Sequence, residues 1–236
     1  EEHIPFVSLS QQVYLPFWGC AFHEQFKADA AIMAKMAPGT QLVFLYLYYA
    51  ENTGSVNLTQ IAKALSLSKA TCTRAINDLS ASGLISQTAE GTNKWITTAY
   101  TKSELLEKAY GRLKTPVDRI LYVKGTAQIE HPIASGIRAL ARQSMIGVND
   151  QDGAIAISKK EAAKIPAEDI CTKQYFEDFG GAVIEVWSYD PIILERDGCV
   201  DDISLLLSMD NDPNERVQTC LDEIRQKHGL PIKEEE

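Results

Sequence analysis

Cysteine is scarce in this sequence, and long hydrophobic runs are missing from it. Five cysteines are spread over 236 residues, and no two of them lie close together. An odd, scattered set does not make a disulfide framework, so we expect a reducing, cytoplasmic location. A membrane-spanning helix needs about 20 consecutive apolar residues, whereas the best run, Leu42 to Ala50, is flanked by Gln41 and Glu51. We therefore expect no transmembrane helix, and the first residues lack the basic-then-apolar pattern of a secretory signal.

The overall composition is that of an average soluble globular protein. Apolar residues make up 45% and charged residues 23% of the chain, which excludes disordered, collagen-like and coiled-coil classes. Since a domain typically has about 100–200 residues, the length corresponds to one large domain or two small ones. We predict an N-terminal extension at 1–38, a first domain at 39–113, a second at 114–229 and an acidic tail at 230–236.

The net charge of −9 is unevenly distributed. Residues 1–124 hold 12 Lys and Arg against 10 Asp and Glu, which gives +2, whereas residues 125–236 hold 11 against 22, which gives −11. Such an asymmetry suggests different partners for the two halves. The N-terminal half is able to approach a polyanion, and the C-terminal half should point away from one.

The pattern in the first domain is typical of a winged helix-turn-helix. We predict an apolar helix at 40–49, a helix at 58–67 capped by Thr59, a third helix that begins after Ser68 and ends near Gly83, and strands on either side of a turn at 90–93. Upstream, we predict an extended segment at 5–19 and a helix from His23 to Met36, and downstream a short helix at 103–110.

The third helix has one apolar and one polar face. Its apolar residues recur at the spacing of a buried helix stripe, at Cys72, Ala75, Ile76 and Leu79. The opposite face is slim, polar and cationic, as a helix that enters a major groove about 12 Å wide needs to be. Arg74 is suited to guanine edges and Asn77 to adenine edges, while Ser68, Lys69 and Thr71 are suited to phosphates; Thr73 lies on the same face.

The segment 58–85, LTQIAKALSLSKATCTRAINDLSASGLI, resembles the DNA-binding core of MarR-type winged-helix regulators. The resemblance extends over about sixty residues, from Thr40 to Thr98. It implies that duplex DNA is the partner and that Ser68, Lys69, Thr71, Thr73 and Arg74 face it. Where the family usually has a basic residue after the first wing strand begins, this chain has Gln87, and Lys94 stands where the wing tip usually has Arg. The long dimerisation helices of the family are not evident, so a homodimer stays open.

The second half alternates strands and helices, and we predict an α/β domain with a smaller sheet. Strands are expected at 119–124, 154–157 and 182–189, and helices at 135–145 and 158–164, while 203–209 is ambiguous. The last helix is predicted to have Asp212 as its N-cap and Pro213 as its first residue. This half loosely resembles a domain related to AbiEi-type antitoxins, through segments 119–125, 135–145, 184–190, 200–208 and 214–217. The fold class is thus α+β, a winged helix-turn-helix domain followed by an α/β domain.

Enzyme chemistry and metal binding are disfavoured. A restriction-type nuclease would need Lys after Glu185, where Trp187 stands instead, and His131 and His228 occur in no triad context. We consider a solvated turn more consistent than a cation site for Asp197, Asp201 and Asp202, and ordinary packing more consistent than zinc for Cys20 and His23. No Gly-rich phosphate loop is present, and no cofactor is expected.

The sequence therefore predicts a bacterial, cytoplasmic transcription regulator that binds double-stranded DNA and is not an enzyme. Its acidic second half would supply regulation or assembly through a protein partner or a small effector. The alternative is an antitoxin-like protein-interaction module that acts through the acidic half, and a metal-dependent hydrolase is a third hypothesis.

Overall fold

The computed structural model describes the backbone at 6–7, 12–15, 20–23, 34–50, 56–90, 93–125, 129–147 and 153–232. Side chains are described at 34–50, 56–88, 95–125, 129–147 and 153–232. The chain forms two compact units, Glu1–Ala34 and Lys35–Glu236. In the described residues, no helix is both long and apolar enough to cross a membrane.

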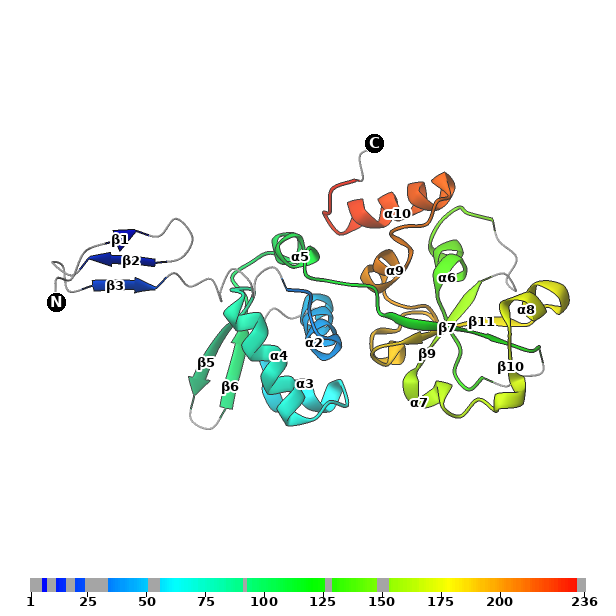
Figure 1. Ribbon diagram of the computed structural model, residues 1–236, viewed down its shortest axis with the longest axis horizontal. Helices are drawn as coiled ribbons and strands as arrows, with labels where there is room; N and C mark the ends of the chain where they lie inside the picture. Colours follow the sequence, from blue (N-terminus) through cyan, green and yellow to red (C-terminus); the bar gives the residue numbers. More distant parts are fainter. Residues whose placement is uncertain are drawn as a thin grey trace. The chain divides into compact units, whose positions relative to one another are not determined.

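The first unit contains a three-stranded antiparallel sheet with the strand order β1-β2-β3 (Figure 1). Its strands are β1 (Phe6–Val7), β2 (Gln12–Leu15) and β3 (Cys20–His23). The predicted helix from His23 to Met36 is wrong at both ends, because His23 pairs with Gln12 in the sheet and Met36 precedes the next helix in non-helical backbone. Residues 24–33 of that prediction lie outside the described residues.

The second unit begins with the predicted winged helix-turn-helix. Three helices precede a hairpin, and a short strand joins the hairpin to give the order β4-β6-β5. The elements are α2 (Pro38–Tyr49), β4 (Val56–Asn57), α3 (Leu58–Ala64), α4 (Lys69–Ala81), β5 (Ser86–Glu90), β6 (Asn93–Thr97) and α5 (Lys102–Tyr110). Pro38 thus starts α2, where its fixed φ and missing N–H are tolerated.

Asn57, and not the predicted Thr59, is the N-cap of α3. The Asn57 side chain accepts a hydrogen bond from the Thr59 backbone N–H at 2.8 Å, and Gln60 Oε1 accepts from the Asn57 N–H at 3.2 Å. Together these bonds form a capping box, which satisfies donors that the first turn leaves free. Thr59 therefore lies inside the helix. At the end of α4, Gly83 adopts φ of 72°, as the predicted left-handed cap requires.

The C-terminal half is built on a five-stranded mixed sheet with the order β10-β7-β11-β9-β8. Figure 1 labels four of these strands, β7, β9, β10 and β11. β11 and β9 are parallel, and the other neighbours are antiparallel. The strands are β7 (Val117–Val123), β8 (Ile133–Ala134), β9 (Ala154–Ser158), β10 (Ile170–Cys171) and β11 (Ala182–Trp187). Both faces of the sheet are covered, since Ile184 and Val186 belong to one apolar cluster and Trp187 belongs to the other.

Helices and short 3-10 turns complete this half. They are α6 (Gly136–Gln143), α7 (Lys159–Ala162), η2 (Ala167–Asp169), α8 (Lys173–Phe179), η3 (Pro191–Leu194), α9 (Asp202–Met209) and α10 (Glu215–Lys227). The ambiguous segment 203–209 is thus helical. The predicted start of the last helix is wrong: Asn214 is the N-cap and accepts from the Arg216 N–H at 3.0 Å, whereas Asp212 accepts from the Asn214 N–H in the preceding turn.

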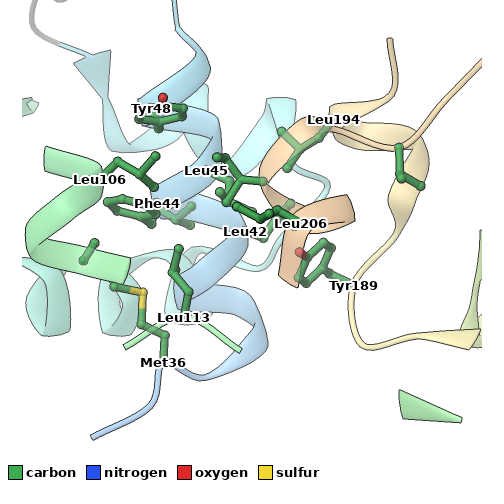
Figure 2. Close-up of a cluster of buried hydrophobic side chains, with 14 of the residues drawn as sticks. Met36, Leu42, Phe44, Leu45, Tyr48, Leu106, Leu113, Tyr189, Leu194 and Leu206 are labelled. Atoms are coloured by element: carbon green, nitrogen blue, oxygen red, sulfur yellow. The ribbon is translucent and has the colours of Figure 1, made fainter. Parts of the chain in front are cut away.

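The winged helix and the C-terminal half share one hydrophobic core. Leu42 and Leu45 of α2 belong to the same cluster of buried side chains as Leu206 of α9 and Leu194 of η3, and the four lie together in Figure 2. These side chains are almost completely shielded from water, so their contacts contribute to the stability of both halves. The predicted domain boundaries stay a prediction, but the two halves of this unit are not joined by a linker alone.

Buried hydrogen bonds reinforce this junction. The Gln41 side chain is 1% exposed, and its Nε2 donates to the Lys114 carbonyl at 2.8 Å while its Oε1 accepts from the Lys114 N–H at 3.1 Å. Gln41 Nε2 also lies 3.4 Å from the hydroxyl of Tyr189, which bonds to Ser204 in α9 at 2.8 Å. Because unpaired buried polar groups are costly, these bonds fix the path of the chain between α5 and β7.

Candidate nucleic-acid interface

Helix α4 begins at Ser68 and buries the predicted stripe. The Ser68 hydroxyl accepts a hydrogen bond from the Thr71 N–H at 3.1 Å, which caps the helix. The buried residues of α4 are Cys72, Ala75, Ile76 and Leu79, and they pack in the core that α2 also enters. Since these four positions fix the rotation of the helix, the opposite face points out of the core.

The outward face carries the residues that the sequence predicted as DNA contacts. Lys69, Arg74 and Asn77 are exposed, and Thr73 is half-buried. The Thr73 hydroxyl donates to the Lys69 carbonyl at 2.8 Å, and Arg74 Nε donates to the Ala70 carbonyl at 3.4 Å. Both side chains therefore lie along the helix, with the cationic end of Arg74 in contact with solvent. The exposure of Lys69, Arg74 and Asn77 shows that the described residues of the C-terminal half do not cover this face.

The N-terminal end of α4 groups two further predicted residues. Ser68 and Thr71 share a hydrogen bond between their hydroxyls at 2.8 Å, close to the free N–H groups of the first turn. Gly39 of α2 lies against this turn, and a Cβ at Gly39 would lie 3.0 Å from Thr71 Cγ2. This close approach of α2 holds the end of the helix that a phosphate would meet.

Asn77 has a partner that the sequence analysis did not anticipate. Gln87 of β5 donates from Nε2 to Asn77 Oδ1 at 3.3 Å, and so connects α4 to the first wing strand. Gln87 occupies the position where the resembled family usually has a basic residue. The Gln87 amide extends the polar surface of α4 onto the wing. In the sequence, the only indication of this contact is the short spacing between α4 and the first wing strand.

The single acidic residue of α4 is turned away from the outward face and neutralised. Asp78 Oδ1 forms an ion pair with Arg112 Nη2 at 2.9 Å. The Arg112 side chain is 5% exposed and comes from the segment after α5. Because this carboxylate is paired, the charges presented outward by α4 are those of Lys69 and Arg74, and the face is net positive.

The last predicted DNA contact, Lys94, belongs to β6, but its side chain lies outside the described residues. The hairpin backbone is nevertheless that of a wing: Ala89 pairs with Lys94, and Glu90 pairs with Asn93, so Lys94 lies next to the turn. The structure thus brings six of the seven predicted residues onto one helix and its cap, with the seventh on the adjacent hairpin.

The three aspartates considered as a cation site do not form one. Asp197 is an exposed turn residue, whereas the Asp201 carboxylate is 2% exposed and caps α9 by accepting from the Ser204 N–H at 3.0 Å. Burial raises the pKa of Asp201, although bonds from Ser204 and Tyr49 act against that shift. No group of three or more metal-ligating side chains occurs among the described residues, and Cys20 and His23 have side chains outside them.

His228, which the sequence analysis set aside, lies in a hydrogen-bonded chain. Its Nε2 is 2.8 Å from Asp202 Oδ2, and its Nδ1 is 2.7 Å from the hydroxyl of Tyr48 in α2. Lys227 also donates to Asp202 at 2.7 Å. Burial acts to raise the pKa of Asp202, but the bonds from His228 and Lys227 outweigh it and lower that pKa to about 2. The chain connects the winged helix to α9 and α10, and no sequence spacing indicated it.

Glu185, considered as a nuclease carboxylate, is instead an internal residue of β11. Its Oε2 accepts from Trp187 Nε1 at 3.0 Å, and burial raises its pKa. Asp152, the acid that would precede Glu185 in the motif of such a nuclease, lies outside the described residues. His131 is an exposed residue.

Comparison with known proteins matches residues 40–94 to the model of the MarR family. No curated protein and no solved structure matches the chain. The matched segment runs from α2 to the start of β6 and includes the whole outward face of α4, and it supports a helix-turn-helix of the type found in MarR regulators. The C-terminal half lies outside the match, so its resemblance to AbiEi-type antitoxins stays a prediction.

Proposed function

We propose that this protein is a sequence-specific DNA-binding transcription regulator, in which α4 enters the major groove of duplex DNA. The observation that carries the proposal is the exposed, cationic face of α4, which is fixed by a buried stripe and left uncovered by the C-terminal half. A helix of this kind beside a hairpin is the arrangement that winged-helix proteins use to read DNA. The family match at 40–94 supports the same conclusion.

Two kinds of contact are expected from this face. Arg74 and Asn77 would read base edges, with Asn77 exchanging its bond from Gln87 for bonds to adenine. Ser68, Lys69, Thr71, Thr73 and Lys94 would hold phosphates or line the groove, and these contacts supply affinity without sequence information. The acidic C-terminal half would be held away from the duplex by repulsion between like charges.

The test is DNA binding by wild type and by the double variant Lys69→Ala/Arg74→Ala, measured by fluorescence anisotropy on duplexes selected from genomic DNA. Loss of the Lys69 phosphate contact should reduce the slope of log K against log salt by about 0.9, and loss of the Arg74 base contact should cost about 1–3 kcal/mol of discrimination. Both residues are exposed, so folding should be unaffected.

A matched control removes two positive charges from the C-terminal half instead of from α4. Lys160 and Lys173 are exposed residues of the C-terminal half, and Lys160→Ala/Lys173→Ala should bind DNA as wild type does. Equal DNA affinity and equal salt dependence of wild type and Lys69→Ala/Arg74→Ala would reject the proposed face. Reduced binding by the control variant alone would transfer the interface to the C-terminal half.

A further inference from the structure

A cavity lies between the winged helix and the C-terminal half. Its volume is about 860 Å³, within the range of small-molecule sites. Tyr48 and Tyr49 of α2 contribute one wall, and Lys102 belongs to the α5 side; the remaining walls come from α6, the turn at 196–199, α9 and α10. Most of the lining therefore lies outside the segment that matches the MarR family.

Three buried aromatic or apolar residues line this cavity, and an acidic residue that also lines it already has partners. Leu140 and Ile224 are buried, as is Tyr48, and all three line the cavity. Asp202 also faces it, but its carboxylate is held by Lys227 at 2.7 Å and by His228 at 2.8 Å. The Asp202 carboxylate is therefore already paired and does not require a cationic group of a ligand. Lys227 is paired as well, so its charge is not available to an anionic ligand.

The rim carries cations that have no carboxylate partner. Lys102, Arg142 and Arg196 form no ion pair among the described side chains. Arg142 Nη1 is 3.4 Å from the Gly198 carbonyl and 3.8 Å from Cys199 Sγ, which are both neutral groups. The guanidinium of Arg196 lies over the Tyr49 ring, 4.7 Å from its centroid, which positions the group, and its N–H groups form no hydrogen bond among the described residues.

The opposing charges are fewer. Asp197 and Glu223 also line the cavity, and both are exposed. With Asp202 compensated by its own partners, three rim cations face two rim carboxylates. Two guanidinium groups on the same rim offer forked donors that match carboxylate and phosphate oxygens.

We propose that this cavity is a binding site for a small organic anion, with Arg142 and Arg196 as the residues that bind its carboxylate or phosphate group. The apolar part of the ligand would pack against Tyr48, Leu140 and Ile224. This site goes beyond the proposed DNA contacts, because none of its cations belongs to α4. Its occupancy would be sensed by α2, the helix that packs against α4.

The site is tested by isothermal titration calorimetry of the full chain, without DNA, with citrate and with pyrophosphate as probes at a constant ionic strength. Two guanidinium groups without a carboxylate partner among the described residues should give saturable binding of at least one probe, with a dissociation constant on the order of 1 mM or lower. Tighter citrate binding would assign the site to carboxylates, and tighter pyrophosphate binding would assign it to phosphates.

Three variants make the test specific. Arg142→Ala/Arg196→Ala should weaken binding by about tenfold or more, the value of a lost charge-assisted hydrogen bond. Arg142→Lys/Arg196→Lys keeps the charge but loses the fork, and should fall between the alanine variant and wild type. The control Lys160→Ala/Lys173→Ala should bind as wild type does.

Two results would overturn the assignment: no binding of either probe at about 10 mM, or equal binding by wild type and Arg142→Ala/Arg196→Ala. Both arginines are exposed, so the variants should keep the fold, and unchanged thermal unfolding verifies this. Because no DNA is present, failure here leaves the proposed DNA interface untouched, and failure of DNA binding leaves this titration unaffected.

Discussion

Truncation of Leu206 should destabilise the winged helix as well as the C-terminal half. Leu206 belongs to α9 and is 0% exposed, within the cluster that includes Leu42 and Leu45 of α2. Leu206→Ala removes buried methyl groups and leaves a cavity, which typically costs about 2–5 kcal/mol. Because one core serves both halves, we expect this loss to be shared by α4, although Leu206 belongs to a different half of the unit.

Native-state hydrogen exchange is the assay, because it reports the free energy of opening for separate segments. The most protected amides of α4 and of β11 should lose about the same opening free energy, in the range of 2–5 kcal/mol. The matched control is Leu207→Ala, which makes the same deletion at the next position of α9, where the side chain is only half-buried. Its effect should be smaller in both segments.

The result that would refute this reasoning is a large loss of protection in β11 with none in α4. That outcome would mean that the winged helix folds independently, and that its contacts with α9 contribute nothing to its stability. Truncation of the chain after α5 would then leave a stable domain, whereas the shared core predicts an unstable one.

Two further predictions concern local contacts. Asn57→Ala should cost about 1 kcal/mol, because it removes the N-cap of α3, whereas Thr59→Ala, inside that helix, should have a smaller effect; urea unfolding of both variants decides between the two caps. The folded-state pKa of Asp202 is about 2, below its unfolded value of about 3.9. The ionised Asp202 carboxylate therefore stabilises the folded protein. This contribution is complete above the unfolded pKa and is lost as the pH falls toward about 2. The contribution of this carboxylate to the unfolding free energy is about 2 kcal/mol. Asp202→Asn should therefore flatten the dependence of unfolding free energy on pH in this interval. An unchanged slope would contradict the hydrogen bonds from His228 and Lys227.

Local patterns in the sequence were sufficient for the winged helix-turn-helix. The apolar spacing of α4 fixed which face is buried, Ser68 fixed where the helix begins, and Gly83 fixed where it ends. Since these signals depend on residues three or four apart, they do not require knowledge of the rest of the fold. For the same reason the outward positions of Lys69, Arg74 and Asn77 were predictable.

The first residue of a helix was predicted wrongly where two possible N-cap residues lie two positions apart, as at α3 and α10. Asn57 and Thr59 are both favoured N-cap residue types near the start of α3, as are Asp212 and Asn214 near the start of α10, and composition does not rank them. The choice follows from which side chain reaches a free N–H, and Gln60 decided it at α3 by completing the capping box. The helix predicted from His23 failed because strand pairing with Gln12, a contact between separate segments, outweighs local helical spacing.

Sequence alone thus determined helix α4, its outward residues and the uneven charge of the chain, because none of these depends on contacts between distant segments. Tertiary structure alone decided that α2 shares its core with α9, that Asp202 and His228 meet Tyr48, and that Arg142 and Arg196 border one cavity. These groups are separated by tens to more than a hundred residues. Only the packing of the whole unit brings them together, since no periodicity links positions so far apart.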